Sequence, residues 1–283
     1  METLLLLTII GGMSLQNVSK KAFNKKTGGK GTYLFSAVSM LTAAVFFAFA
    51  GEKSVTIDCA WMPYSLGFAV SCGISVVCSF LAIQCGSLSL TSLATSYSLI
   101  IPTIYGLVFL NETSGIWLYL GIILLMISLV LINNRDSDVK ITVKWAVFAF
   151  FAFLGNGVCT TVQKMQQIAF DGEAKNEFMM VALLVLSAFM FVLAFVWEKQ
   201  VWGECFKKGS GWMVLCGVAN GAVNLFVMIL AGYMPASVMF PLVSAGGILL
   251  TAAISRWVYR EKLTRRQSIG LVLGIGAVIF LNL

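Results

Sequence analysis

Long apolar runs separated by short polar stretches make up most of this chain. A helix needs about 20 mostly apolar residues to cross a bilayer core that is about 30 Å thick. Ten runs approach this length, at about 3–19, 32–50, 63–86, 88–110, 115–133, 145–163, 178–197, 211–231, 235–255 and 267–283. They lack the regular alternation of apolar and polar residues that marks a membrane β-strand. The pattern therefore predicts an all-α integral membrane protein with ten transmembrane helices.

Charged residues and tryptophans support the ends of these runs. None of the ten runs contains Asp, Glu, Lys, Arg or His. Every tryptophan lies at or next to the end of a run, as in the aromatic belts of membrane interfaces: these are Trp61, Trp117, Trp145, Trp197, Trp202, Trp212 and Trp257. The first run has no basic segment before it, and a basic segment, Lys20 to Lys30, follows it. We therefore interpret the first run as a mature helix and not as a signal peptide.

The composition argues against an enzyme. Without histidine the chain has no imidazole base, no histidine-bound metal and no Ser–His or Cys–His nucleophile pair. The seven cysteines form no Cys-x-x-Cys motif and lie mostly in apolar runs, so we expect them to pack as small apolar side chains. An enzyme working inside the membrane would need a base, a metal site or an acid pair at bilayer depth, and the runs offer none of these. The sequence therefore predicts no catalytic residue, no metal and no cofactor.

The spacing of marker residues repeats along the chain. A glutamate with a glycine nine residues after it occurs at Glu112 and again at Glu261. Each of these glutamates follows the fourth run of a group of five, and we expect both to cap or pair at the membrane interface. The repetition predicts two five-helix repeats, residues 1–138 and 139–283.

The two repeats are expected to have opposite orientations in the membrane. Five helices cross the membrane an odd number of times, so the second repeat enters from the other side, as in the inverted repeats of secondary transporters. The loops after runs one, five, seven and nine carry 16 Lys and Arg, and the opposite face carries three. The positive-inside rule then puts the basic loops in the cytoplasm and both termini outside the plasma (inner) membrane. The same rule explains the net charge of +7 without a nucleic-acid partner.

The second half carries a more specific set of motifs. Pro241 lies in the ninth run, and the junction after that run contains Tyr-Arg-Glu-Lys-Leu-Thr. Gln267 and Gly270 follow, and the last run is rich in glycine. In these features and in its ten runs the chain resembles the drug/metabolite transporter superfamily, and specifically its EamA-type ten-helix branch.

This resemblance implies a transporter whose central cavity is built from helices one, three, four, six, eight and nine, with helices five and ten behind them. The first half fits less well, since Pro102 lies ten residues before Glu112, whereas Pro241 lies 20 residues before Glu261. Many bacterial members of this family place both termini in the cytoplasm, and the charge count here predicts the reverse.

Polar side chains at bilayer depth are candidates for substrate contacts, because an unpaired amide or hydroxyl in hydrocarbon costs a few kcal/mol. The candidates lie on helices that the resemblance assigns to the cavity: Gln16, Asn17, Gln84, Tyr97, Asn156, Gln163, Asn220 and Asn224. Asn220 and Asn224 are four residues apart, so we expect them on one helix face. The alternative for each candidate is a hydrogen bond between helices, worth about 0.6 kcal/mol. For Lys164 we expect a snorkelling position at the interface, with a substrate contact as the alternative.

No acidic residue lies in any run, so the intramembrane carboxylate that proton-coupled transporters commonly use is missing. The sequence therefore predicts a secondary transporter that moves a small metabolite or drug-like molecule by alternating access. The molecule is expected to be neutral, zwitterionic or weakly polar, and transport to be exchange or facilitated, with export among the directions. The alternative is a lipid or amphiphile translocator on the same fold, whose basic loops would hold the headgroup.

The expected partners are a small-molecule substrate and membrane lipids, with no nucleic acid. We expect a monomer or a weak homodimer. The glycines of Gly270-x3-Gly274 mark a face of close helix approach. Packing of this face against the fifth helix is favoured over contact with a second copy.

Overall fold

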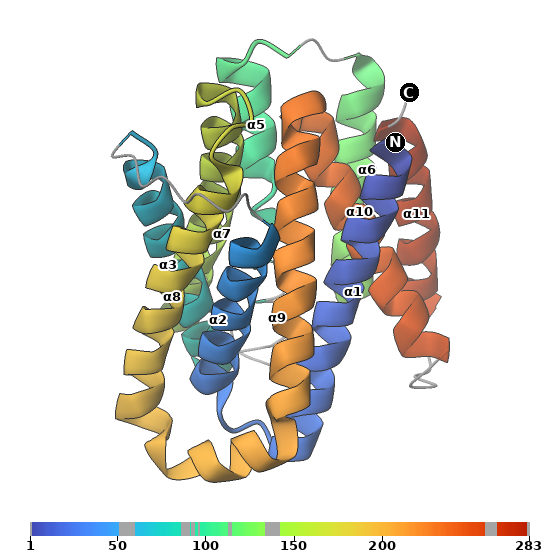
Figure 1. Ribbon diagram of the computed structural model, residues 1–283. Coiled ribbons are helices and arrows are strands. Elements are labelled where there is room, and N and C mark those ends of the chain that lie inside the picture. Colours follow the sequence, from blue (N-terminus) through green and yellow to red (C-terminus); the bar gives the residue numbers. More distant parts are fainter. Residues whose placement is uncertain are drawn as a thin grey trace. The chain divides into compact units, whose positions relative to one another are not determined.

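The computed structural model is helical almost throughout (Figure 1). It describes residues 2–50, 60–85, 91, 94–95, 97–112, 115–133, 142–257 and 265–281. The helices are α1 (Glu2–Thr27), α2 (Thr32–Ala50), α3 (Met62–Cys85), α5 (Ile100–Phe109), α6 (Ile116–Asn133), α7 (Val143–Ala169), α8 (Lys175–Glu198), α9 (Trp202–Tyr233), α10 (Ala236–Trp257) and α11 (Arg265–Leu281), with a short 3₁₀ helix, η1 (Lys199–Val201), between α8 and α9. These ranges contain no strand, and the predicted all-α class is confirmed.

Several helices are apolar enough to cross a membrane. In the described part of the chain, four helical segments have both the length and the hydropathy: Thr32–Ala50, Met62–Cys85, Val143–Ala169 and Lys175–Tyr233. Shorter apolar helices occur at Ile100–Phe109, Ile116–Ser128, Ala236–Gly247 and Ser268–Ala277. The apolar helices indicate a multi-pass membrane protein, and the number of ten crossings stays a prediction.

The helices extend beyond the apolar runs at several ends. Lys20 to Lys26, which the sequence analysis assigned to a loop, form the last two turns of α1. Lysine is a good helix former, and positive charge is favourable near a helix C-terminus, so the loss of hydropathy does not end the helix. The end comes at Gly28 and Gly29, whose φ angles of 65° and 79° suit glycine and not a side chain with a Cβ.

The chain forms two compact units that differ from the two predicted repeats. Unit 1 contains Met1–Gly73 and Met165–Gly232, and unit 2 contains Ile74–Lys164 and Tyr233–Leu283. This division follows contacts in space, whereas the repeats follow spacing in the sequence. The two repeats and their inversion therefore stay predictions.

Unit 1 is held together by close packing of α2 with α8 and α9. Ser187 donates a hydrogen bond to the carbonyl of Ala37 at 2.9 Å, which joins α8 to α2. On the α9 side, a Cβ added to Gly217 would lie 2.6 Å from the Ser39 carbonyl oxygen and 2.5 Å from the Cβ of Thr42. Only a residue without a side chain allows the two backbones to approach so closely.

We therefore expect Gly217→Ala to lower the free energy of unfolding by about 1–3 kcal/mol, the usual cost of overpacking a tight contact. The matched control is Gly211→Ala in the same helix, where an added Cβ meets no atom within 4 Å. At that open position alanine should stabilise the helix by about 0.5–1 kcal/mol. Thermal unfolding of the two variants in detergent compares them directly, and equal melting temperatures would contradict the packing described.

In unit 2, α6 and α11 pack closely along their lengths. Ser128 donates a hydrogen bond to the Gly270 carbonyl at 2.6 Å. A Cβ on Gly274 would lie 2.7 Å from the Ser128 hydroxyl oxygen. The prediction that the Gly270–Gly274 face packs against the fifth apolar run is confirmed.

Candidate functional site: amide groups in two units

Three of the predicted site residues form one hydrogen-bonded group in unit 1. The Asn224 amide donates to Asn220 Oδ1 at 2.7 Å and to the Asn220 carbonyl at 2.9 Å. The Asn220 amide donates in turn to Gln16 Oε1 at 3.4 Å. We call these three half-buried residues the amide cluster. The prediction that Asn220 and Asn224 share one helix face is confirmed.

A close approach of α1 and α9 brings these amides together. A Cβ added to Gly12 would lie 2.5 Å from Val223 Cγ2 and 3.6 Å from the Ala219 carbonyl oxygen. Gln16 lies one turn after Gly12 on α1, next to the point of contact. Glycine at this contact allows the short Asn220 side chain to reach across to the neighbouring helix.

Two other residues of α1 flank the cluster. Asn17 is exposed, and successive helix residues point about 100° apart, so its side chain leaves α1 in a different direction from that of Gln16. Ser19 is fully buried, and its hydroxyl has no hydrogen-bond partner among the described residues. Ser19 is not among the predicted site residues. Its spacing of three residues from Gln16, which puts both on one helix face, is the signal that could have identified it.

Asn156 of α7 belongs to a second polar group, in unit 2. Its amide donates to the Ser98 hydroxyl at 2.6 Å, where the fourth apolar run is interrupted by a turn before α5. Pro102 has no N–H to donate to the Ser98 carbonyl, and that carbonyl accepts from Ile101 N at 3.0 Å instead.

The other predicted site residues of unit 2, Tyr97, Gln84 and Gln163, differ in their burial and contacts. The Tyr97 hydroxyl donates to the Met126 carbonyl of α6 at 3.0 Å, which is a contact between helices. Gln84 is exposed near the end of α3. Gln163 is only 3% exposed and lies two turns after Asn156 on α7.

A charged group in unit 2 anchors the start of α10. The Glu112 carboxylate accepts hydrogen bonds from Ala236 N at 2.8 Å and from Ser237 N at 2.9 Å. It thereby satisfies N–H groups that the first turn of a helix leaves without partners. The predicted capping role of Glu112 is confirmed, and Glu261 lies outside the described residues.

Lys164 differs from its predicted snorkelling position. Its side chain is only 5% exposed, and its Nζ donates to the Met234 carbonyl at 3.0 Å. The break between α9 and α10 supplies that carbonyl acceptor, so the ammonium is held inside the protein and does not reach for an interface.

Metal ligands and cysteines, as well as hydrogen-bonding groups, bear on what the described residues can bind. Among them, no group of three or more His, Cys, Asp or Glu is placed to hold a metal ion. Of the six described cysteines, which are free thiols, Cys159, Cys205 and Cys216 are buried as expected of small apolar side chains, Cys72 and Cys78 are half-buried, and Cys85 is exposed. Each of the two polar groups presents amide or hydroxyl donors and acceptors.

Comparisons with known proteins give a family and a fold. Residues 143–283 match the model of the EamA-like transporter family. No curated protein sequence matches the chain. A solved crystal structure superposes on it with a TM-score of 0.80, covering 99% of this chain and 98% of that chain at 14% sequence identity. At that identity the similarity shows the fold alone.

Proposed function

Since the chain belongs to the EamA-like transporter family of the drug/metabolite transporter superfamily, we propose that it is a secondary transporter working by alternating access. Its substrate is a small neutral, zwitterionic or weakly polar molecule, and the transport mode is exchange or facilitated diffusion. The proposed substrate site is the amide cluster of unit 1, and the Asn156–Ser98 pair of unit 2 is a separate polar group.

The observation that carries this proposal is the hydrogen-bonded chain from Asn224 through Asn220 to Gln16. An amide presents both a donor and an acceptor, so the cluster can exchange its internal hydrogen bonds for bonds to a substrate. No charged residue lies in the apolar runs that carry it. Because an isolated charge in a low-dielectric site costs several kcal/mol, the cluster favours a group without net charge.

The positions of two glutamates support exchange or facilitated transport over proton coupling. Glu112 caps the start of α10 through both carboxylate oxygens. Glu198 accepts a hydrogen bond from Leu34 N at 2.9 Å in the first turn of α2. Both carboxylates are used in holding helices together, and the apolar runs themselves contain no acid.

We further propose the plasma membrane as the location, with the lysine-rich end of unit 1 in the cytoplasm and both termini outside. The charge asymmetry of the loops supports this orientation. The same exposed lysines are the observation that favours the alternative function, translocation of a lipid or amphiphile. We propose a monomer or a weak homodimer, because the Gly270–Gly274 face is used by α6 within unit 2.

A ligand screen by thermal stability tests the proposal and separates the two functions. The purified chain in detergent is screened against amino acids, nucleosides, sugars, amines, aromatic drugs and short-chain lipids. A ligand at about 100 times its dissociation constant adds about 2.7 kcal/mol to the folded state. We expect a saturable rise in melting temperature with one class of soluble compound. Stabilisation by lipids alone would favour the lipid translocator instead.

A further inference from the structure

Six exposed lysines gather at one end of unit 1, where four helix ends meet. We call them the lysine platform: Lys25 and Lys26 of α1, Lys30 of the turn after it, Lys199 of η1, and Lys207 and Lys208 of α9. Figure 1 shows η1 and the start of α9 crossing the lower end of the unit. This end is the one where α2 begins and α8 ends, because Leu34 N donates to Glu198 Oε2 at 2.9 Å.

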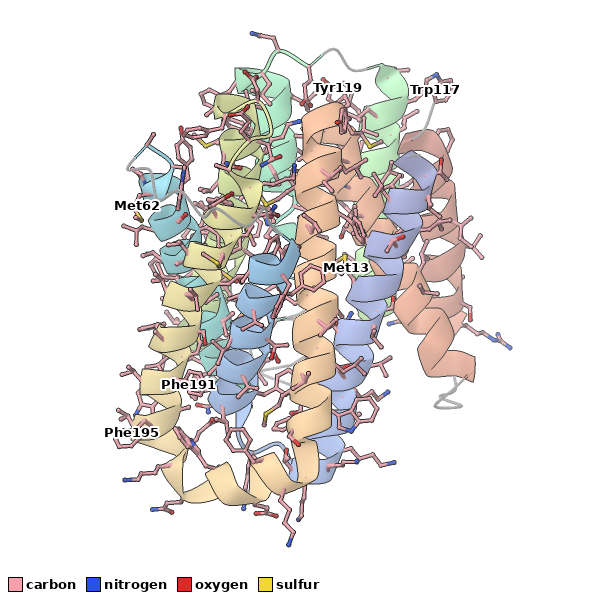
Figure 2. All side chains as sticks on the ribbon, in the orientation of Figure 1. Met13, Met62, Trp117, Tyr119, Phe191 and Phe195 are labelled. Atoms are coloured by element: carbon pink, nitrogen blue, oxygen red, sulfur yellow. The ribbon has the colours of Figure 1, made fainter. Side chains whose placement is uncertain are left out.

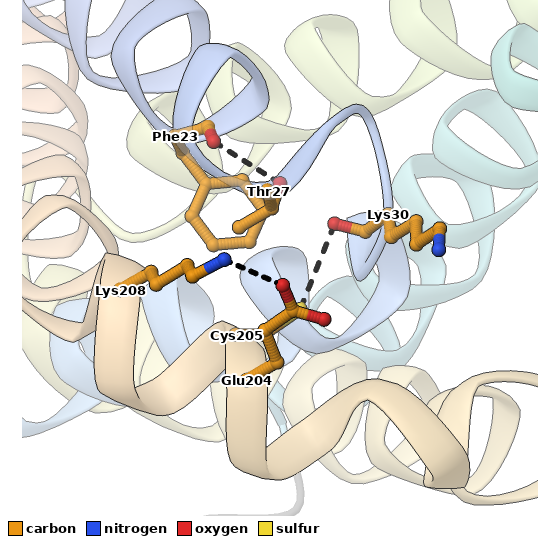
Figure 3. Close-up of polar contacts among 6 residues, drawn as sticks. All are labelled: Phe23, Thr27, Lys30, Glu204, Cys205 and Lys208. Carbon is orange, nitrogen blue, oxygen red and sulfur yellow. Dashed lines mark hydrogen bonds and ion pairs between the residues drawn. The ribbon is translucent and has the colours of Figure 1, made fainter.

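Buried contacts fix the start of α9 against the turn between α1 and α2 (Figure 3). The Cys205 thiol donates to the Lys30 carbonyl at 3.7 Å. Gly209, one turn later, faces the ring of Phe23 so closely that a Cβ there would overlap it. Cys205 and Gly209 thus form the inner face of this segment, and Phe206 and Lys207 are exposed.

The acids at this end of unit 1 neutralise only part of the platform. Among the described residues they are Glu198, which is bonded to Leu34 N, and Glu204. Glu204 pairs with Lys208 at 2.6 Å, and both side chains are about half exposed, at 51% and 50%. The remaining lysines of the platform leave this end strongly positive.

Aromatic side chains of the kind found at membrane interfaces lie beside the lysine platform. Lys199 Nζ lies 4.6 Å from the centroid of Phe195, which Figure 2 shows near the lower end of α8. Lys26 Nζ lies 5.7 Å from the ring centroid of Trp212, and Trp197 is 60% exposed. Tryptophan and lysine together are typical of the headgroup region, where an aromatic ring meets lipid and an ammonium meets phosphate.

From this arrangement we propose that the lysine platform binds the headgroups of anionic phospholipids. The ammonium groups are exposed, in excess over acids, and spread over a surface beside interfacial aromatics, so they suit several separate phosphates and not one enclosed ligand. Each lysine close to an anionic surface strengthens binding roughly fivefold. The assignment concerns the surrounding membrane and holds whichever molecule the protein transports.

The test compares two triple variants of the full chain that lose the same charge. Lys25→Gln, Lys26→Gln and Lys207→Gln remove half of the platform and leave the Glu204–Lys208 pair intact. The control carries Lys144→Gln, Lys175→Gln and Arg265→Gln, which lie outside the platform. Dioleoyl phosphatidylglycerol or phosphatidylcholine is titrated into the detergent-solubilised protein, and the rise in melting temperature gives an apparent affinity.

We expect phosphatidylglycerol to bind the platform variant roughly a hundredfold more weakly than the wild type or the control, because each of the three lost lysines contributes roughly fivefold. A variant with arginine at the same three positions should bind like the wild type, because it keeps the charge. Raising the salt concentration should weaken binding to the wild type. Equal affinity of the two glutamine variants would overturn the proposal. The proposal would also be overturned if phosphatidylcholine or soluble glycerol 3-phosphate raised the melting temperature of the wild type as much as phosphatidylglycerol does.

Discussion

Replacing Glu112 with alanine is expected to lower the free energy of unfolding by about 2–4 kcal/mol. The carboxylate accepts two hydrogen bonds, at 2.8 Å from Ala236 N and 2.9 Å from Ser237 N. One hydrogen bond to a charged group contributes about 1.5–3 kcal/mol, and two bonds to the same carboxylate contribute less than twice that amount. Ala236 and Ser237 are buried, so water cannot replace the lost acceptor. Glu112 also acts electrostatically on Lys164, whose positive charge the variant would leave without its acidic neighbour.

Thermal unfolding of the full chain in detergent measures this effect. Glu112→Gln should lose less stability than Glu112→Ala, since the glutamine carbonyl can still accept one of the two hydrogen bonds. Glu173→Ala is the control, because Glu173 is exposed and surface substitutions usually change stability by less than about 0.5 kcal/mol. If the Glu112→Ala variant had the same melting temperature as the wild type, the carboxylate would not be what holds the start of α10.

The second large effect is expected on transport. Asn220→Ala combined with Asn224→Ala should reduce saturable flux of the substrate at least tenfold, the loss of about 1.4 kcal/mol or more of substrate binding. The two substitutions remove the middle and one end of the amide cluster, and Gln16 loses its partner on α9. The free energy of unfolding should fall by less than the free energy of substrate binding, because hydrogen bonds between membrane helices contribute about 0.6 kcal/mol on average.

Uptake by the variant in proteoliposomes is compared with that of Gln200→Ala, which removes an exposed amide from η1. We expect the control to transport like the wild type. Unchanged flux in the double variant would show that the amide cluster is not the substrate site, while leaving the transport function itself standing.

The periodic apolar runs predict the helices well but not their ends. Hydropathy reports where a segment avoids water, and it falls at Lys20, whereas the helix continues to Thr27 because lysine favours helix and no glycine intervenes. Local sequence also fails to predict the position of Lys164, for which a snorkelling position at the interface was expected. Its burial depends on the Met234 carbonyl, 70 residues away in the chain, which no local pattern reveals.

The candidate site was predictable in its residue types and only partly in its connections. The spacing of Asn220 and Asn224 is local, so their shared face follows from helix geometry alone. Their link to Gln16 depends on the close approach at Gly12, which is a tertiary contact. For Tyr97, sequence alone leaves both a substrate contact and a helix contact open, and packing decides the hydrogen bond to Met126.

The proposed exchange or facilitated transport is tested most directly by counterflow in proteoliposomes. Vesicles that contain the protein are loaded with an unlabelled compound identified in the ligand screen, and labelled compound is added outside. We expect labelled compound to accumulate transiently inside, to saturate with concentration and to be absent from protein-free vesicles. If a compound that stabilises the protein showed no counterflow and no saturable uptake, the protein would bind that compound without transporting it, which contradicts the central claim.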